Sequence, residues 1–182
     1  SEMCIRDRAI ISDFKDLILM QLTRKNKWLN SSELKHRLKE KRILDWLNEE
    51  YSITKKISSK AEFKLEILRD DIGIAEEDEY AALKMSPEEV RIREVLLYGN
   101  LLPLVHARSI IPTLTSSKGY PGLGSIGSKP LGDLIFQSKL FVKTNREFAE
   151  FTMADNSNVW GRRTHYLVRD CPLTVMEVFL SP

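Results

Sequence analysis

Two charged residues share strand faces with apolar side chains, and they are the first candidates for chemistry. In the run RIREVLLY, period-two alternation places Arg93 on the same face as Val95. In LTVMEVFL, the same alternation places Glu177 beside Val175. Because an unpaired charge is costly to bury, each of these side chains is expected to have a partner or a ligand.

Two interpretations of this pair follow from the residue types. Arg93 can offer a planar guanidinium to a carboxylate, and Glu177 can accept a hydrogen bond from a hydroxyl. Alternatively, the two form a buried salt bridge with each other, or both strand faces are exposed to solvent. A second cationic spot, WGRR at 160–163, is more typical of a strand-edge anchor than of a site.

The stretch YPGLGSIGSKPLG carries the spacing G-x-G-x-x-G at Gly122, Gly124 and Gly127. In a dinucleotide site, this spacing follows a strand directly and opens a helix. Here TLTSSKGYP separates the first glycine from the strand that ends near Pro112, and Pro130 disfavours helical backbone just before it. The pattern therefore predicts a flexible lid or loop and not a cofactor cradle.

The elements that position these residues are predicted from periodicity. An amphipathic helix is expected over Ala9–Thr23, and a second helix begins after Ser31 or Ser32 and runs toward Glu50. The apolar contacts of the second helix are Leu34, Leu38, Leu44 and Leu47. Both helices are expected to cover a core.

Strand patterning begins at Glu62 and dominates the rest of the chain. The acidic run DDIGIAEEDEYAALKMSPEE is expected to be a surface connection, and the runs on either side of YGN predict a hairpin. After a short helix at Leu131–Gln137, three further strands are expected in REFAEFTM, RRTHYLVRD and LTVMEVFL. Strands joined by turns favour a single α+β domain with an antiparallel sheet.

Composition narrows the class of protein. With 182 residues, 42% hydrophobic and 30% charged, the chain is typical of one soluble globular domain, and its expected location is the cytoplasm. Basic residues gather in the first third but alternate with acids and lack interleaved aromatics, so solvated helices are favoured over a nucleic-acid surface. Neither the cysteines Cys4 and Cys171 nor the three histidines have metal-ligand spacing. Residues 1–8 resemble a translated sequencing adapter, so neither fold nor function is inferred from them.

Six segments, in order and at similar spacing, resemble the chorismate pyruvate-lyases, which make 4-hydroxybenzoate for ubiquinone synthesis. They are DWLNEEYSITKKI, IREVLLYG, ARSIIP, KPLGDLIF, NVWGRRTHYLV and PLTVMEVFLSP. The resemblance covers residues 45–182 as a chorismate lyase-like domain. Residues 1–44 are left as an N-terminal helical extension.

The resemblance implies a fold and a set of site residues. The fold is α+β, with an antiparallel sheet of about six strands, packed helices, and flaps over an internal ligand cavity. By position, Arg93 matches the arginine that binds the ring carboxylate, and Glu177 matches the carboxylate that meets the 4-hydroxyl. Ile53 and Leu131 match residues whose backbone N–H groups bind the ligand's carboxylate.

The implied reaction converts chorismate to 4-hydroxybenzoate and pyruvate without a metal or other cofactor. The resemblance also implies product inhibition, a monomer, no nucleic-acid partner and no stable membrane insertion. Two other functions stay open at this stage. One is a non-catalytic domain of the same fold that senses a small carboxylate in a transcription regulator; the other is a lyase that acts on a related cyclohexadiene acid.

Overall fold

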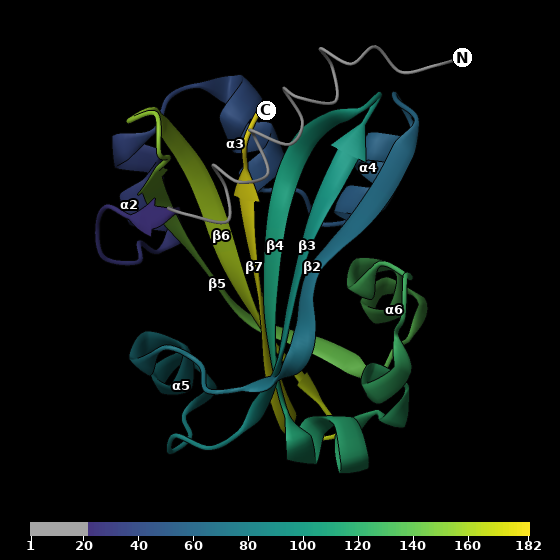
Figure 1. Ribbon diagram of the computed structural model, residues 1–182. Coiled ribbons are helices and arrows are strands. Elements are labelled where there is room, and N and C mark those ends of the chain that lie inside the picture. Colours follow the sequence, from purple (N-terminus) through teal and green to yellow (C-terminus); the bar gives the residue numbers. More distant parts are fainter. Residues whose placement is uncertain (1–21) are drawn as a thin grey trace.

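The alternating runs pair into one antiparallel sheet in the computed structural model, which describes residues 22–182 (Figure 1). The sheet has seven strands in the order β1-β5-β6-β7-β4-β3-β2, one more than the six expected. The strands are β1 (Thr23–Arg24), β2 (Phe63–Gly73), β3 (Val90–Gly99), β4 (Leu102–Pro112), β5 (Phe141–Thr152), β6 (Asn158–Val168) and β7 (Cys171–Phe179). The helix expected over 9–23 lies outside the described residues except for its last two positions, where Thr23 belongs to β1.

Within residues 22–182, five α-helices and two irregular turns connect and cover these strands. They are α2 (Ser31–Arg37), α3 (Lys41–Leu47), α4 (Ile53–Ser58), α5 (Glu77–Leu83), α6 (Leu131–Gln137), the π-helical turn η1 (Thr115–Gly119) and the 3₁₀ turn η2 (Pro121–Ser125). The helix predicted at Leu131–Gln137 is confirmed. The single helix expected from Ser31 toward Glu50 is instead two helices, because Leu38 adopts an extended backbone and ends α2.

The residue that caps α2 is Asn30, which directly precedes the two serines expected as caps, Ser31 and Ser32. The Asn30 side chain accepts from the Glu33 amide at 2.9 Å, while the Glu33 carboxylate accepts from the Asn30 amide at 2.9 Å. This reciprocal capping box satisfies two helix-end donors at once and fixes the entry of the chain. Despite the break, Leu34, Leu38 and Leu47 are all buried, as the periodicity predicted.

The hairpin predicted at YGN is confirmed. Asn100 and Leu101 have φ values of 49° and 67°, which gives the turn the twist that matches two right-twisted strands. A second tight turn, at Arg169 and Asp170 with φ values of 47° and 62°, joins β6 to β7. Short turns of this kind fix the strand register, and the register decides which side chains share a face.

The acidic run expected to be a surface connection is structured, so that prediction was wrong. Strand β2 continues to Gly73, and α5 follows. Tyr80 and Leu83 from α5 are buried in a cluster with Ile92 and Ile110 from the sheet. Tertiary packing of this apolar pair, three residues apart on one helical face, outweighs the acidic composition.

The sheet has two faces, which are covered by different elements (Figure 1). Helices α2, α3 and α4 pack on the face that carries Val95 and Ala107, and α6 packs further along the same face; this is called the α4 face below. The opposite face carries Ile92 and Ile110 and is covered by α5; this is called the α5 face. Each face therefore has its own buried layer.

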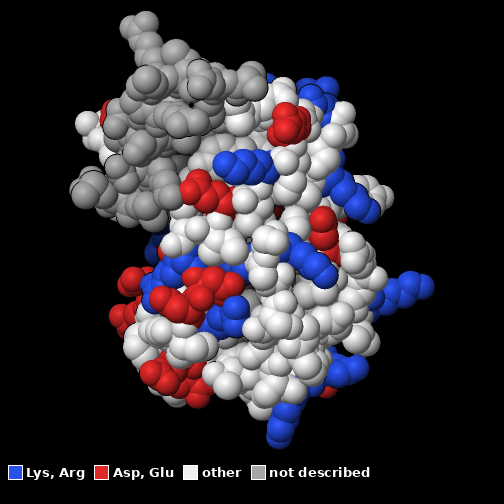
Figure 2. Space-filling view, turned by 45° about the vertical axis from the view of Figure 1, so that its right-hand side comes forward, with Lys and Arg blue, Asp and Glu red and all other residues white. Residues whose placement is uncertain are grey.

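The outer surface carries both signs of charge. Figure 2 shows basic and acidic side chains lying next to one another on the face in view. Among residues 22–182, no helix has the length and apolar character needed to cross a membrane.

Candidate active site

The strand register places Arg93 and Glu177 on the α4 face, in neighbouring rows of side chains. Arg93 on β3 lies opposite Ser109 on β4, and Ser109 lies opposite Val175 on β7. Glu177 is two residues farther along β7, in the row that also holds Ala107 and Arg162. The alternation in the sequence thus identified the correct face for both residues.

Arg93 and Glu177 do not form a salt bridge with each other. Strand β4 lies between their two strands, which separates them by two strand spacings, or roughly 9–10 Å. Each pairs with a different residue, as described below. The two side chains are therefore held apart on one face of the sheet.

Arg93 is buried, with 2% of its surface exposed, and its guanidinium is tightly held. Nη1 donates to Asp70 Oδ2 at 2.7 Å, and Nη2 donates to the carbonyls of Gly127 and Lys129 at 2.8 and 3.0 Å. Burial acts to raise the pKa of Asp70, but hydrogen bonds and charges from Arg91 and Arg93 outweigh it, so this pKa lies below its ordinary value. The three bonds use at most three of the five N–H donors of Arg93.

Glu177 is held by Arg162, which is also 2% exposed. Arg162 Nε donates to Glu177 Oε2 at 2.7 Å. Its Nη1 donates to the carbonyls of Leu47 and Glu49 at 3.1 and 2.6 Å, at the end of α3. Because a helix ends with carbonyls that lack internal partners, this cation both completes α3 and neutralises Glu177.

Ile53 and Leu131 are the first residues of α4 and α6. The N–H groups of a first turn have no partner within their own helix, so both amides are potential donors to an anion. Ser52 joins the two helix starts, because its hydroxyl accepts from the Lys55 amide at 3.3 Å and donates to Asp133 Oδ1 at 2.9 Å. This bond ties the start of α4 to the first turn of α6.

All four residues predicted for the site line one cavity of about 50 Å³. This volume holds only a few water molecules, so a ring-sized ligand requires the cover to move. The cover is formed by the start of α4 and by α6 with the residues before it. The remaining lining is Thr54, Leu65, Val95, Leu97, Ala107, Ser109, Pro130, Gly132, Ile135, Phe136, Arg162, Tyr166 and Val175.

Four polar residues of this cavity were not predicted: Thr54, Ser109, Arg162 and Tyr166. Burial, and next the charge of Glu177, raise the pKa of the Tyr166 hydroxyl above its ordinary value, so this group stays a hydrogen-bond donor. The signal for two of them was present in NVWGRRTHYLV, where alternation puts Arg162 and Tyr166 on one face. The interpretation of WGRR as an edge anchor missed it, because β6 is a central strand.

The glycine stretch is not preceded directly by a strand. Strand β4 ends at Pro112, and the turns η1 and η2 intervene before α6 begins after Pro130. Gly127 has φ of +61°, which favours glycine, and the segment lies against the cavity through its contacts with Arg93. The prediction that this stretch does not have the strand and helix context of a dinucleotide fingerprint is confirmed.

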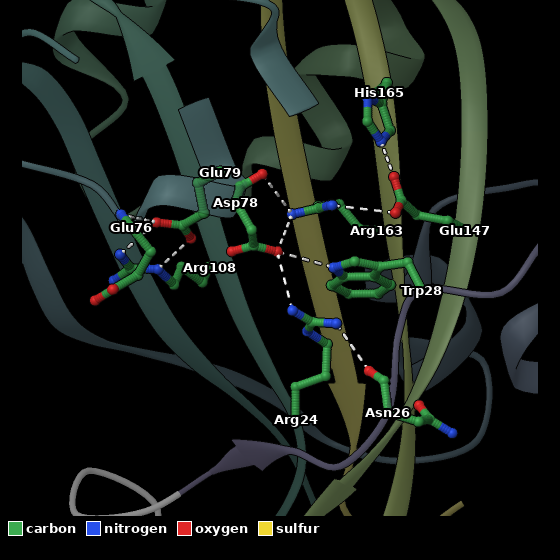
Figure 3. A network of polar contacts seen from close by, with 10 residues as sticks. All are labelled: Arg24, Asn26, Trp28, Glu76, Asp78, Glu79, Arg108, Glu147, Arg163 and His165. Atoms are coloured by element: carbon green, nitrogen blue, oxygen red, sulfur yellow. Dashed lines mark hydrogen bonds and ion pairs between the residues drawn. The ribbon is translucent and has the colours of Figure 1, made fainter. Parts of the chain in front are cut away.

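A separate polar network occupies the α5 face (Figure 3). Arg163 donates to Asp78 at 3.0 Å and to Glu147 at 3.1 Å, and Trp28 Nε1 donates to the same Asp78 oxygen at 3.0 Å. The guanidinium of Arg163 also lies 4.3 Å from the centre of the Trp28 ring. This network fastens the N-terminal strand and α5 to the sheet.

Further along that face, Arg108 donates to Glu79 at 2.7 and 2.9 Å and to Glu94 at 3.0 Å. The network lines a second hollow of about 410 Å³.

Within residues 22–182, no three His, Cys, Asp or Glu side chains gather closely enough to hold a metal ion.

Comparison with known proteins decides the family. The family model described as Chorismate lyase matches residues 22–182. The chain belongs to the chorismate lyase family. The match includes residues 22–44, which pack onto the sheet through Leu29, Leu34 and Leu38.

The names of similar proteins are consistent with membership of the chorismate lyase family. The chain is 33% identical over 162 residues to "Probable chorismate pyruvate-lyase 2" of Pseudomonas entomophila (strain L48), covering 84% of this chain and 87% of that protein. It is 31% identical over 145 residues to "Chorismate pyruvate-lyase" of Escherichia coli O1:K1 / APEC, covering 78% and 84%.

Solved structures share the fold at low identity. The ligand-binding domain of a putative GntR-family transcriptional regulator from Bordetella bronchiseptica has a TM-score of 0.51 at 16% identity, covering 67% of this chain and 86% of that one. The PhnF C-terminal domain has a TM-score of 0.53 at 16% identity, covering 71% and 87%. These likenesses concern the fold alone.

Proposed function

We propose that this protein is a chorismate pyruvate-lyase, which converts chorismate to 4-hydroxybenzoate and pyruvate. The observation that carries the proposal is that Arg93 and Glu177 lie in one closed cavity, on strands separated by β4. Family membership and the names of the relatives support it.

The cavity has complementary groups at its two ends. Arg93, with the helix-start amides of Ile53 and Leu131, provides donors for the ring carboxylate. Glu177 provides an acceptor for the 4-hydroxyl at the other end. A six-membered ring with these substituents at opposite positions bridges the gap between the two strands.

The reaction can be completed within the substrate. The bond between ring C3 and the enolpyruvyl oxygen breaks, and the hydrogen on C4 moves to the enolpyruvyl methylene through a six-membered cyclic arrangement. The ring becomes aromatic and the side chain leaves as pyruvate, so the atoms balance without an added reactant. We therefore propose that the reaction needs neither a metal nor a redox cofactor.

The role of the protein is then to select a reactive conformer and to exclude water. Arg93 and Arg162 are held by Asp70 and Glu177 before the substrate arrives, so these two cations need no reorganisation when charge develops on the ether oxygen. Product keeps the carboxylate and the hydroxyl, so it is expected to be retained and to inhibit. We place the reaction, as the family resemblance implies, at the first committed step of ubiquinone biosynthesis, in a cytoplasmic monomer.

The test is turnover of chorismate by the purified protein with a chelator present, with 4-hydroxybenzoate and pyruvate measured in parallel. Equal amounts of the two products, and inhibition by added 4-hydroxybenzoate, are expected. Absence of both products at micromolar enzyme contradicts the proposal. Tight binding of 4-hydroxybenzoate without turnover would instead favour a ligand-sensing role.

Two variants test the assigned roles. Arg93→Ala is expected to weaken carboxylate binding by about 2–5 kcal/mol, because it removes a desolvated charge pair. Glu177→Gln is expected to lower kcat more than it changes KM, because its contact is with the reacting ring. Exposed Glu62→Gln is the matched control and should leave both constants unchanged. Wild-type kinetics in Glu177→Gln would remove the proposed role of that residue.

A further inference from the structure

The segment that precedes α6 and reaches the cavity at Pro130 is held by two arginines from one strand. The segment is residues 122–130, called the glycine loop here. Arg91 Nη1 donates to the Gly124 carbonyl at 2.9 Å, and Arg93 Nη2 donates to the carbonyls of Gly127 and Lys129. Since carbonyl acceptors of a loop have no strand partner, these three bonds anchor its backbone directly.

A single carboxylate orients both arginines. Asp70 on β2 lies directly opposite Arg93 in the strand register. Its Oδ1 accepts from Arg91 Nε and its Oδ2 from Arg93 Nη1, both at 2.7 Å. The side chain of Asp70 is only 13% exposed, so this interaction is partly shielded from solvent.

The charges of this cluster do not balance. Two guanidiniums share one carboxylate, which leaves a net charge of about +1 next to the cavity. A ligand carboxylate at Arg93 would neutralise the excess. It would bind the same guanidinium that holds two carbonyls of the glycine loop.

We propose that Asp70 and Arg91 are positioning residues that couple closure of the glycine loop to occupancy of Arg93 by a carboxylate. The coupling rests on the proposed function, because the ligand is the substrate or product carboxylate. A ligand that fixes the Arg93 guanidinium stabilises the closed loop, and by linkage the closed loop retains the ligand by the same factor. Opening then requires the bonds from both arginines to break, which sets the rate of product release.

Arg91 is the residue that tests the coupling most directly. It contacts the loop and Asp70 but is absent from the cavity lining, so it does not touch the ligand site. Arg91→Met keeps most of the side-chain length and removes the bond to Gly124. Arg69→Met is the matched control, since Arg69 lies on β2 and pairs with Asp71 at 2.7 Å without contacting the loop.

Amide hydrogen exchange of the glycine loop is measured with and without 4-hydroxybenzoate. In the wild type, the ligand should slow exchange of the loop. Arg91→Met and Asp70→Asn should speed exchange in the free protein and reduce the protection by ligand, by roughly tenfold for a coupling of ordinary size. Arg69→Met should match the wild type. Equal loop exchange in Arg91→Met and the wild type overturns the proposal.

The dissociation rate of 4-hydroxybenzoate, followed by competition, provides a second measurement. In Arg91→Met it should rise by a factor similar to the gain in exchange, whereas the rate of a single turnover of chorismate should change little. A purely structural defect would instead lower the rate of the single turnover as well, which contradicts the proposal. Failure of the proposed function is distinct from this: it appears as absence of products in a protein whose loop exchange still responds to Arg91→Met.

Discussion

At the scale of single residues, the most connected side chain of the cavity is Arg162. It binds Glu177 and the carbonyls of Leu47 and Glu49, and its guanidinium lies 5.6 Å from the centre of the Phe179 ring. A buried cation with this many partners contributes to packing as well as to charge. It therefore links the Glu177 end of the cavity to the end of α3.

Arg162→Met is expected to destabilise the protein by about 3 kcal/mol, because it leaves Glu177 partly buried without its cation. The double variant Arg162→Met/Glu177→Leu should recover part of that loss, since both charges are then absent. Urea unfolding of the two single variants and the double variant measures the coupling. A double variant no more stable than Arg162→Met would show that Glu177 does not depend on this pair.

The sequence pattern predicted which face of a strand a side chain occupies, but it did not predict which residue pairs with that side chain. Alternation alone placed Arg93 and Glu177 on the cavity face, and the resemblance added Ile53 and Leu131. Asp70, however, was assigned to a surface connection, because the pairing of β2 with β3 that makes it a strand residue is a long-range contact. Local periodicity carries no information on which distant strand supplies a counterion.

At the scale of elements, the starts of two short helices form one side of the cavity. Ser52 caps α4 and reaches Asp133 in the first turn of α6. Each helix start alone is a common feature, and the hydrogen bond between the Ser52 and Asp133 side chains joins the two. The sequence identified α6 with correct ends, whereas α5 was missed because its apolar pair lies in an acidic run.

Ser52→Ala is expected to lower the free energy of unfolding by about 1 kcal/mol, the usual effect of losing an N-cap. It should also weaken 4-hydroxybenzoate binding, because α4 and α6 are no longer tied together. Ser58→Ala on the same helix is the control; its hydroxyl donates to the Thr54 carbonyl at 2.8 Å and is remote from α6. Calorimetric titration of both variants makes the comparison, and equal affinities would contradict the assigned link.

At the scale of the whole molecule, the α5 face carries a buried histidine whose ionisation opposes folding. His106 is 7% exposed, and burial lowers its pKa to about 4 despite the nearby carboxylate of Glu94. Arg108 acts in the same direction as burial. The folded state therefore binds this proton less readily than the unfolded chain does.

Because the folded pKa lies below the unfolded value of about 6.5, stability is expected to fall as the pH drops from 6.5 toward 4. The contribution of His106 at pH 5 is about 2 kcal/mol of lost stability, calculated from these two pKa values. His106→Gln should reduce the slope of unfolding free energy against pH in this interval. Exposed His36→Gln should retain the wild-type slope, and identical slopes in all three proteins would refute the assignment.

Two adjacent arginines on β6 point to opposite faces of the sheet. Arg162 contacts Glu177 in the cavity, and Arg163 contacts Asp78 in the network on the α5 face. A one-residue insertion or deletion near Trp160 would exchange the two faces for the rest of the strand. It would remove Arg162 from Glu177 and Arg163 from Asp78 at the same time. Changes of chain length should therefore be tolerated at the β5–β6 turn and not within β6, whatever residue is inserted.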